Sequence, residues 1–193
     1  MNFQNQPRQF ATATPFTVPS SRWSDAVAGD LSPAELLLYR SNLLGSDLTV
    51  TNFGGGNTSA KLTGTDPLTS KEVPVLWVKG SGGDIGSMKL DGFSTLYLDR
   101  LLGLESLYRG LEHEDEMVGY LPHCTFNLNP RAASIDTPLH AFLPFAHVDH
   151  VHPGRDLGRR AIFRDVRVID SGRGCATIWR KSAALVRAAA NAC

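Results

Sequence analysis

The sequence predicts one mixed α/β domain in which helices and strands intermingle along the chain. Its 193 residues and 42% apolar content suit a single globular core. Helical signals near residue 33 are followed by three β-prone runs, and leucine-rich helical segments then precede another β-prone run that ends at residue 152. No internal repeat interrupts this order, so the pattern favours an α/β or α+β class.

The first helix is predicted to begin at Pro33. Ser32 can cap its free amides, and Glu35 can complete a capping box. Gly45 is expected to end the helix, since glycine readily adopts the positive φ of many helix ends. Residues 1–30 are rich in Gln, Asn, Ser, Thr and Pro, which predicts a loose N-terminal arm.

Alternating and continuous apolar runs predict the remaining elements. Residues 48–53 and 58–62 are expected to form two strands joined by a Gly-rich turn, and the apolar run 74–78 is typical of a buried strand. The other elements predicted are a helix with buried leucines over residues 93–109, an acidic helix over 112–121, a short helix over 139–142 and a strand over 146–152.

Composition excludes several classes of protein. No stretch approaches the roughly 18 consecutive apolar residues of a membrane span, and the first 21 residues lack the apolar core of a secretory signal. Three cysteines are too few for a disulfide framework, and Cys124 is interpreted as a small core residue. We therefore expect no membrane partner and a cytoplasmic location.

Charge is distributed unevenly along the chain although the total is zero. Residues 1–153 hold ten Lys and Arg against sixteen Asp and Glu, whereas residues 154–193 hold nine against three. Such a break indicates a boundary or a basic arm that binds a partner. Only Phe163 and Trp179 are aromatic near these arginines, so we expect no nucleic-acid partner.

Two Gly-rich loops are candidates for binding an anion. Residues 54–59 join consecutive glycines to Asn57, Thr58 and Ser59, and residues 80–86 follow a buried strand. Exposed amides and small polar side chains in such loops suit a phosphate. Neither loop has the spacing of a nucleotide fingerprint. Composition alone favours an ordinary hairpin turn for the first loop, and the second is equally consistent with a flexible connection.

Histidines and aspartates are concentrated between residues 136 and 152. His150 and His152 are two positions apart on a predicted strand, so both imidazoles should project from one face while His147 faces the other way. This spacing suits a divalent metal, zinc above all. Asp136 and His140 lie upstream and add a carboxylate and a further imidazole.

Four segments together resemble the class II aldolase/adducin family, and most closely the aldolase half of bifunctional rhamnulose-1-phosphate aldolase/alcohol dehydrogenase proteins. The resemblance covers residues 32–153 and is carried by NFGGGNTSAKL, VLWVKGSGGDIGSMKLDGFS, RGLEHEDEMVGYLPHCTFNLNPRAASIDTPLHAFLP and AHVDHVHP. It implies a three-layer α/β/α fold around a largely antiparallel sheet. It also implies a homo-oligomer where that fold is complete.

The resemblance also implies a zinc-dependent lyase that cleaves rhamnulose 1-phosphate to dihydroxyacetone phosphate and lactaldehyde. Asp136 corresponds to the family's catalytic carboxylate, where other branches have Glu, and His150 and His152 correspond to its zinc-binding pair. The positions that correspond to the family's contacts with the substrate phosphate are Gly56, Asn57, Ser59, Lys79, Gly80, Ser81 and Ser134.

The family pattern stops at Gly154. The segment 154–193 contains no histidine, although the family would supply a third zinc histidine there. The chain is therefore divided into an arm over residues 1–30, a C-terminally incomplete aldolase-like domain over 31–153, and a basic tail that a shifted reading frame would explain. An inactive fragment or a non-catalytic adducin-like assembly domain is the alternative function.

Overall fold

The computed structural model describes residues 21–48 and 51–151, which form a four-stranded sheet with helices on both faces. The strands are β1 Asn57–Thr65, β2 Glu72–Lys79, β3 Phe93–Tyr97 and β4 His147–His150. The α-helices are α1 Asp25–Ala28, α2 Pro33–Gly45, α3 Leu98–Gly103, α4 Glu114–Tyr120 and α5 Thr137–Phe142. Short 3₁₀ turns cover Leu90–Gly92, Leu104–Leu107, Leu111–His113 and Leu121–Cys124.

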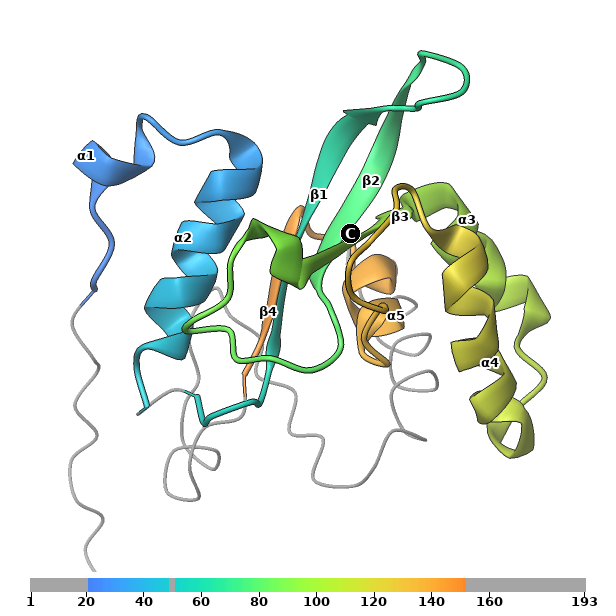
Figure 1. The fold of residues 1–193 in the computed structure, drawn as a ribbon. Coiled ribbons are helices and arrows are strands. Elements are labelled where there is room, and N and C mark those ends of the chain that lie inside the picture. Colours follow the sequence, from blue (N-terminus) through green and yellow to red (C-terminus); the bar gives the residue numbers. More distant parts are fainter. Residues whose placement is uncertain (1–20, 49–50, 152–193) are drawn as a thin grey trace, which may run out of the picture.

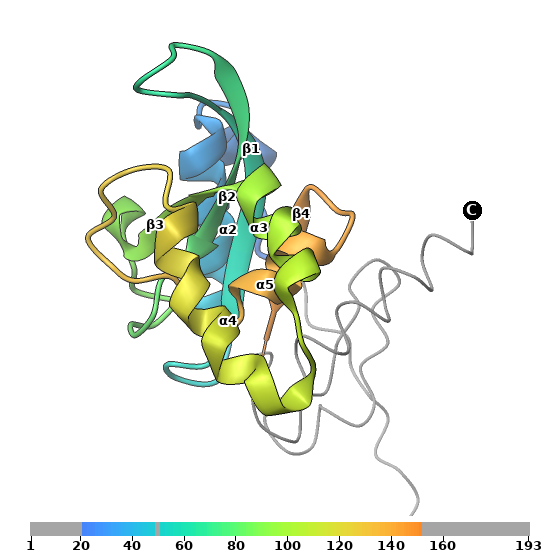
Figure 2. The same ribbon diagram turned by 90° about the vertical axis from the view of Figure 1, so that its right-hand side faces the viewer.

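The elements form three layers around an antiparallel sheet whose strand order is β3-β2-β1-β4. Helix α2 lies on one side of the sheet and α3, α4 and α5 on the other (Figures 1 and 2). The predicted α/β/α arrangement is thus confirmed for the described residues. Its predicted C-terminal incompleteness, and the predictions for the basic tail, concern residues after Val151, outside the described part.

Each face of the sheet has its own apolar core because successive side chains of a strand alternate between the faces. Leu37 of α2 packs with Ala60 and Phe93 on one face. On the other face Leu76 and Val78 of β2 join leucines of the helical layer. The predicted core role of Cys124 is confirmed, since its thiol lies in this second cluster.

Helix α2 begins as predicted but ends for a different reason. The Ser32 side chain accepts a hydrogen bond from the Glu35 amide, and the Glu35 carboxylate accepts one from the Ser32 amide. Gly45 is itself the last helical residue and has no positive φ. A Cβ there would lie 2.0 Å from the backbone nitrogen of Gly86, so glycine is required by close packing of two backbone segments.

Two predicted elements are wrong. Residues 51–53 are not a strand, so β1 is preceded by an irregular loop, and residues 49–50 of this run lie outside the described part. Residues 93–109 are not one helix, because 93–97 form β3 before the chain turns into α3. Leu102 and Leu107, predicted as buried, are 44% and 47% exposed. In the described part of the chain, no helix is long and apolar enough to cross a membrane.

Candidate active site

Asn57 at the start of β1 lies directly opposite His150 in β4. Residues that face each other across an antiparallel pair project from the same side of the sheet. Both side chains are buried, with 2% and 7% of their surface exposed. Gly56 permits this approach: it has a φ of +81°, and a Cβ there would lie 2.5 Å from the His150 carbonyl oxygen.

Ser134 and Asp136 reach the same place from the segment that leads into α5. The Asn57 Nδ2 group donates hydrogen bonds to Ser134 Oγ at 3.0 Å and to Asp136 Oδ2 at 2.5 Å. Asp136 Oδ2 also lies 4.0 Å from His150 Nδ1. We call Asn57, Ser134, Asp136 and His150 the polar cluster. Residues almost 80 positions apart in the chain therefore meet at one carboxylate.

Ser59 and His140 contact each other on the same face of the sheet as the polar cluster. The His140 Nδ1 atom lies 2.7 Å from Ser59 Oγ, and both side chains are fully buried. Burial, and secondarily the nearby His150, lowers the pKa of His140 to about 3. His140 is therefore neutral over the physiological range and holds α5 against β1. The Ser59 hydroxyl, predicted to bind phosphate, contacts this histidine.

His147 and Asp149 project from the opposite face of β4, as the alternation of a strand requires. Asp149 Oδ1 accepts a hydrogen bond from Arg40 Nε of α2 at 3.1 Å. Burial raises the pKa of Asp149, and the Arg40 guanidinium opposes that rise. The sheet therefore separates the charged residues of β4: His147 and Asp149 lie on one face, and only His150 of these three joins the polar cluster on the other.

The second Gly-rich loop lies against the segment that leads to Ser134 and Asp136, since Gly80 forms an antiparallel bridge with Ala133. The Gly80 and Ser81 amides donate to the carbonyls of Gly92 and Ala132 at 2.9 and 2.8 Å, so both are used within the protein. Lys79 follows Val78 in β2, so its side chain projects from the other face of the sheet, the face on which Phe93 and Met88 pack. No hydrogen bond joins the Lys79 or Ser81 side chain to Asn57 among the described residues, but the charge of Asp136 raises the pKa of Lys79 against the effect of burial.

The cluster has donor groups that suit zinc. An imidazole and a carboxylate lie side by side, and the buried Asn57 Oδ1 has no hydrogen-bond partner among the described residues. Residues 21–48 and 51–151 contain no group of three His, Cys, Asp or Glu side chains placed to hold a metal. His152, the other predicted ligand, lies outside the described residues.

Arg40 was not identified from the sequence. Arg40 sits on an ordinary helix face, and its contacts with Asp149 and the Ser59 carbonyl arise only when α2 docks on β1 and β4. For His140 the available signal in the sequence was its spacing from Asp136, because positions four apart lie on one face of a helix.

A solved structure, the N-terminal class II aldolase domain of a conserved protein from Thermoplasma acidophilum, superimposes on this chain with a TM-score of 0.64. It is 30% identical, and the match covers 77% of this chain and 68% of that one. This chain belongs to the class II aldolase family. The expected family is thus confirmed at this level.

A curated relative of this class II aldolase chain is the uncharacterized oxidoreductase YuxG of Bacillus subtilis, which is 49% identical over 132 residues. That match covers 68% of this chain but 19% of the relative, so the chain corresponds to a small part of that protein. No family model matches the chain.

Proposed function

We propose that this class II aldolase domain is a carbon–carbon lyase for a ketose 1-phosphate, with rhamnulose 1-phosphate as substrate and dihydroxyacetone phosphate and lactaldehyde as products. The observation that carries the proposal is the meeting of Asn57, Asp136 and His150 on one face of the sheet. These are three of the positions at which the sequence resembles the family's functional residues.

The proposed cofactor is one zinc ion held by His150 and His152, with Asp136 beside it. The buried imidazole and the adjacent carboxylate support a metal at this position. When bound, zinc would act as a Lewis acid that polarises the substrate carbonyl.

Asp136 is the proposed acid–base group. The Asn57 side-chain amide donates a hydrogen bond to its Oδ2 atom, and this contact holds the carboxylate in place. When the C3–C4 bond breaks, the carbon next to the carbonyl keeps the electron pair, and the C4 hydroxyl loses its proton as it becomes the aldehyde. The Asp136 carboxyl would donate a proton to that carbon and become a carboxylate, and the proton released from the hydroxyl would restore it. Asn57, Ser134 and the Gly56 amide would bind the substrate phosphate at the same edge of the sheet.

A retro-aldol assay with rhamnulose 1-phosphate and added zinc tests the proposal. Asp136→Asn should lower turnover by about a hundredfold or more, since it removes the proton-transfer group without changing its shape. His150→Ala should also lower the stoichiometry of bound zinc. Asp115→Asn and His123→Gln, at exposed positions, are the matched controls.

Two outcomes would contradict this function. Turnover that persists in Asp136→Asn would remove the carboxylate from the mechanism. A folded wild-type protein that binds zinc but releases no dihydroxyacetone phosphate would favour the assembly-domain alternative.

A further inference from the structure

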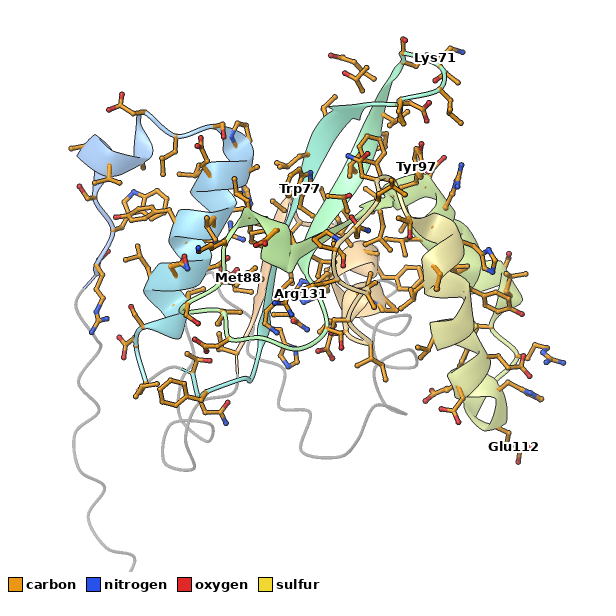
Figure 3. The ribbon with its side chains drawn as sticks, in the orientation of Figure 1. Lys71, Trp77, Met88, Tyr97, Glu112 and Arg131 are labelled. Carbon is orange, nitrogen blue, oxygen red and sulfur yellow. The ribbon has the colours of Figure 1, made fainter. Side chains whose placement is uncertain are left out.

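One irregular segment of the chain brings Ser134 and Asp136 to the polar cluster. We call residues 125–136, which precede α5, the crossing segment. It passes β3 first and the end of β2 next, and it meets Asn57 of β1 last. Figure 3 shows Arg131, near the middle of this segment, beside the end of β2 and far from the tip of the β1–β2 hairpin. The contacts along this segment therefore set the place of the proposed catalytic carboxyl.

Asn129 attaches the crossing segment to β3, the edge strand of the sheet. Its Oδ1 atom accepts hydrogen bonds from the amide and the hydroxyl of Thr95 at 3.0 and 2.8 Å, and its Nδ2 group donates to the Thr95 carbonyl at 3.1 Å. The Phe126 amide donates to the same carbonyl at 2.9 Å. A side-chain amide offers the donor and the acceptor of a peptide group. Asn129 therefore takes the place that a residue of a neighbouring strand would occupy beside Thr95.

The crossing segment is also attached to the sheet through its backbone, closer to the polar cluster. The Arg131 carbonyl accepts a hydrogen bond from Ser94 Oγ, and the Ala132 carbonyl accepts one from the Ser81 amide, both at 2.8 Å. A Cβ on Gly80 would lie 2.8 Å from Arg131 Cβ, so the segment directly contacts the end of β2. Each of these attachments is a single hydrogen bond or a packing contact, whereas the side-chain anchor on β3 consists of three hydrogen bonds.

Asp136 needs a fixed position because it is the proposed proton donor. Its Oδ2 atom lies 2.5 Å from Asn57 Nδ2 and 4.0 Å from His150 Nδ1, and these two partners stand on β1 and β4. The crossing segment supplies the carboxyl but neither of these partners, so a shift of the segment changes the distances within the cluster. Misplacement of a reacting group by about 1 Å can cost roughly a hundredfold in rate.

We propose that Asn129 is a positioning residue, which fixes the crossing segment on β3 and thereby places the Asp136 carboxyl against Asn57. The inference rests on the proposed function, because it takes this carboxyl as the acid–base group. The Asn129 side chain acts from a distance, since its hydrogen bonds are made with Thr95 rather than with the polar cluster.

Steady-state kinetics of the retro-aldol reaction of rhamnulose 1-phosphate, with zinc added, test this role. Asn129→Ala should lower kcat by at least about tenfold. The stoichiometry of bound zinc should stay at the wild-type value, because the crossing segment does not carry His150. Asn129→Asp keeps the acceptor for the Thr95 amide and hydroxyl but cannot donate to the carbonyl, so its kcat should lie between the two. Asn127→Ala, at an exposed position of the same segment, is the matched control and should keep the wild-type kcat.

Hydrogen exchange measured by mass spectrometry separates this inference from the proposed function. In Asn129→Ala the amides of residues 131–136 should exchange at least about tenfold faster than in the wild type, while those of β1 and β4 keep their rates. If Asn129→Ala does not fold, Asn129→Asp takes its place in both measurements. A wild type that shows no turnover, together with this exchange pattern, would reject the proposed function and retain the anchoring of the segment by Asn129.

Three results would overturn the positioning role. The first is an active wild type whose kcat is unchanged in Asn129→Ala. The second is an equal loss of kcat in Asn127→Ala. The third is faster exchange across the whole domain or unchanged exchange in the crossing segment, since either would mean that Asn129 does not hold this segment in particular.

Discussion

Burial decides which polar side chains near the active site can carry a charge. His140 is enclosed by α5 and β1, and its pKa of about 3 lies well below the 6.5 of a free imidazole. At pH values between about 3 and 6.5, His140 is protonated in the unfolded chain but neutral in the folded protein. Stability from this residue is therefore complete above pH 6.5 and is lost progressively as the pH falls toward 3.

We expect His140→Gln to reduce this acid sensitivity. The amide can still contact Ser59 Oγ but does not titrate, so the free energy of unfolding should change less between pH 6.5 and 3 than in the wild type. Urea unfolding at a series of pH values measures it. His123→Gln, at an exposed position, is the control and should keep the wild-type pH dependence. An unchanged slope in His140→Gln would mean that another group causes the acid sensitivity.

Single residues also show what the sequence could and could not predict. Asn57, Asp136 and His150 were identified because they stand in specific motifs, and the structure brings them together. The opposite orientation of His147 followed from strand periodicity and is confirmed. Arg40 had no local signal, because its contacts with Asp149 and with the Ser59 carbonyl join residues 109 and 19 positions apart in the chain.

At the scale of elements, the main error was the segment 93–109. All five side chains of β3 are buried, so this strand shows no polar–apolar alternation and its period cannot be distinguished from that of a buried helix. Antiparallel pairing with β2 decides the conformation, and that pairing joins residues about 20 positions apart. Where a cap fixed the boundary locally, as at Ser32, the prediction is confirmed.

The contact between the end of α2 and the second Gly-rich loop gives a prediction at this scale. Gly45→Ala should destabilise the protein by roughly 1–3 kcal/mol or more, since the new Cβ would lie 2.0 Å from the Gly86 nitrogen and backbone must move. Gly103→Ala, at the end of α3 with no atom within 4 Å of the new Cβ, is the matched control. It should be neutral or stabilising by up to about 1 kcal/mol. Equal unfolding midpoints for the two variants would contradict the close contact.

At the scale of the whole molecule, Arg40 connects two of the three layers. From α2 its guanidinium donates to Asp149 of β4 at 3.1 Å and to the Ser59 carbonyl of β1 at 2.7 Å. Both strands carry residues of the polar cluster on their other face, Asn57 on β1 and His150 on β4. One cation on the α2 side therefore fixes the pair of strands that presents the proposed catalytic groups on the α5 side.

We expect Arg40→Met to lower the free energy of unfolding by about 1–3 kcal/mol, since Asp149 would remain largely buried without its partner and the pair is only partly exposed to solvent. Breaking the exposed pair of Arg109 and Glu116 by Arg109→Met should have a much smaller effect, because solvent screens both of these charges. Loss of Arg40 should raise the pKa of Asp149 further, because burial already raises it and the opposing cation is gone. The folded variant then binds a proton at Asp149 more readily than the unfolded chain does. The difference in free energy of unfolding between the variant and the wild type should therefore shrink as the pH is lowered toward that pKa.

Adding Asp149→Asn to Arg40→Met should recover part of the lost free energy of unfolding at neutral pH. A double variant less stable than Arg40→Met would show that the two side chains do not act as a pair.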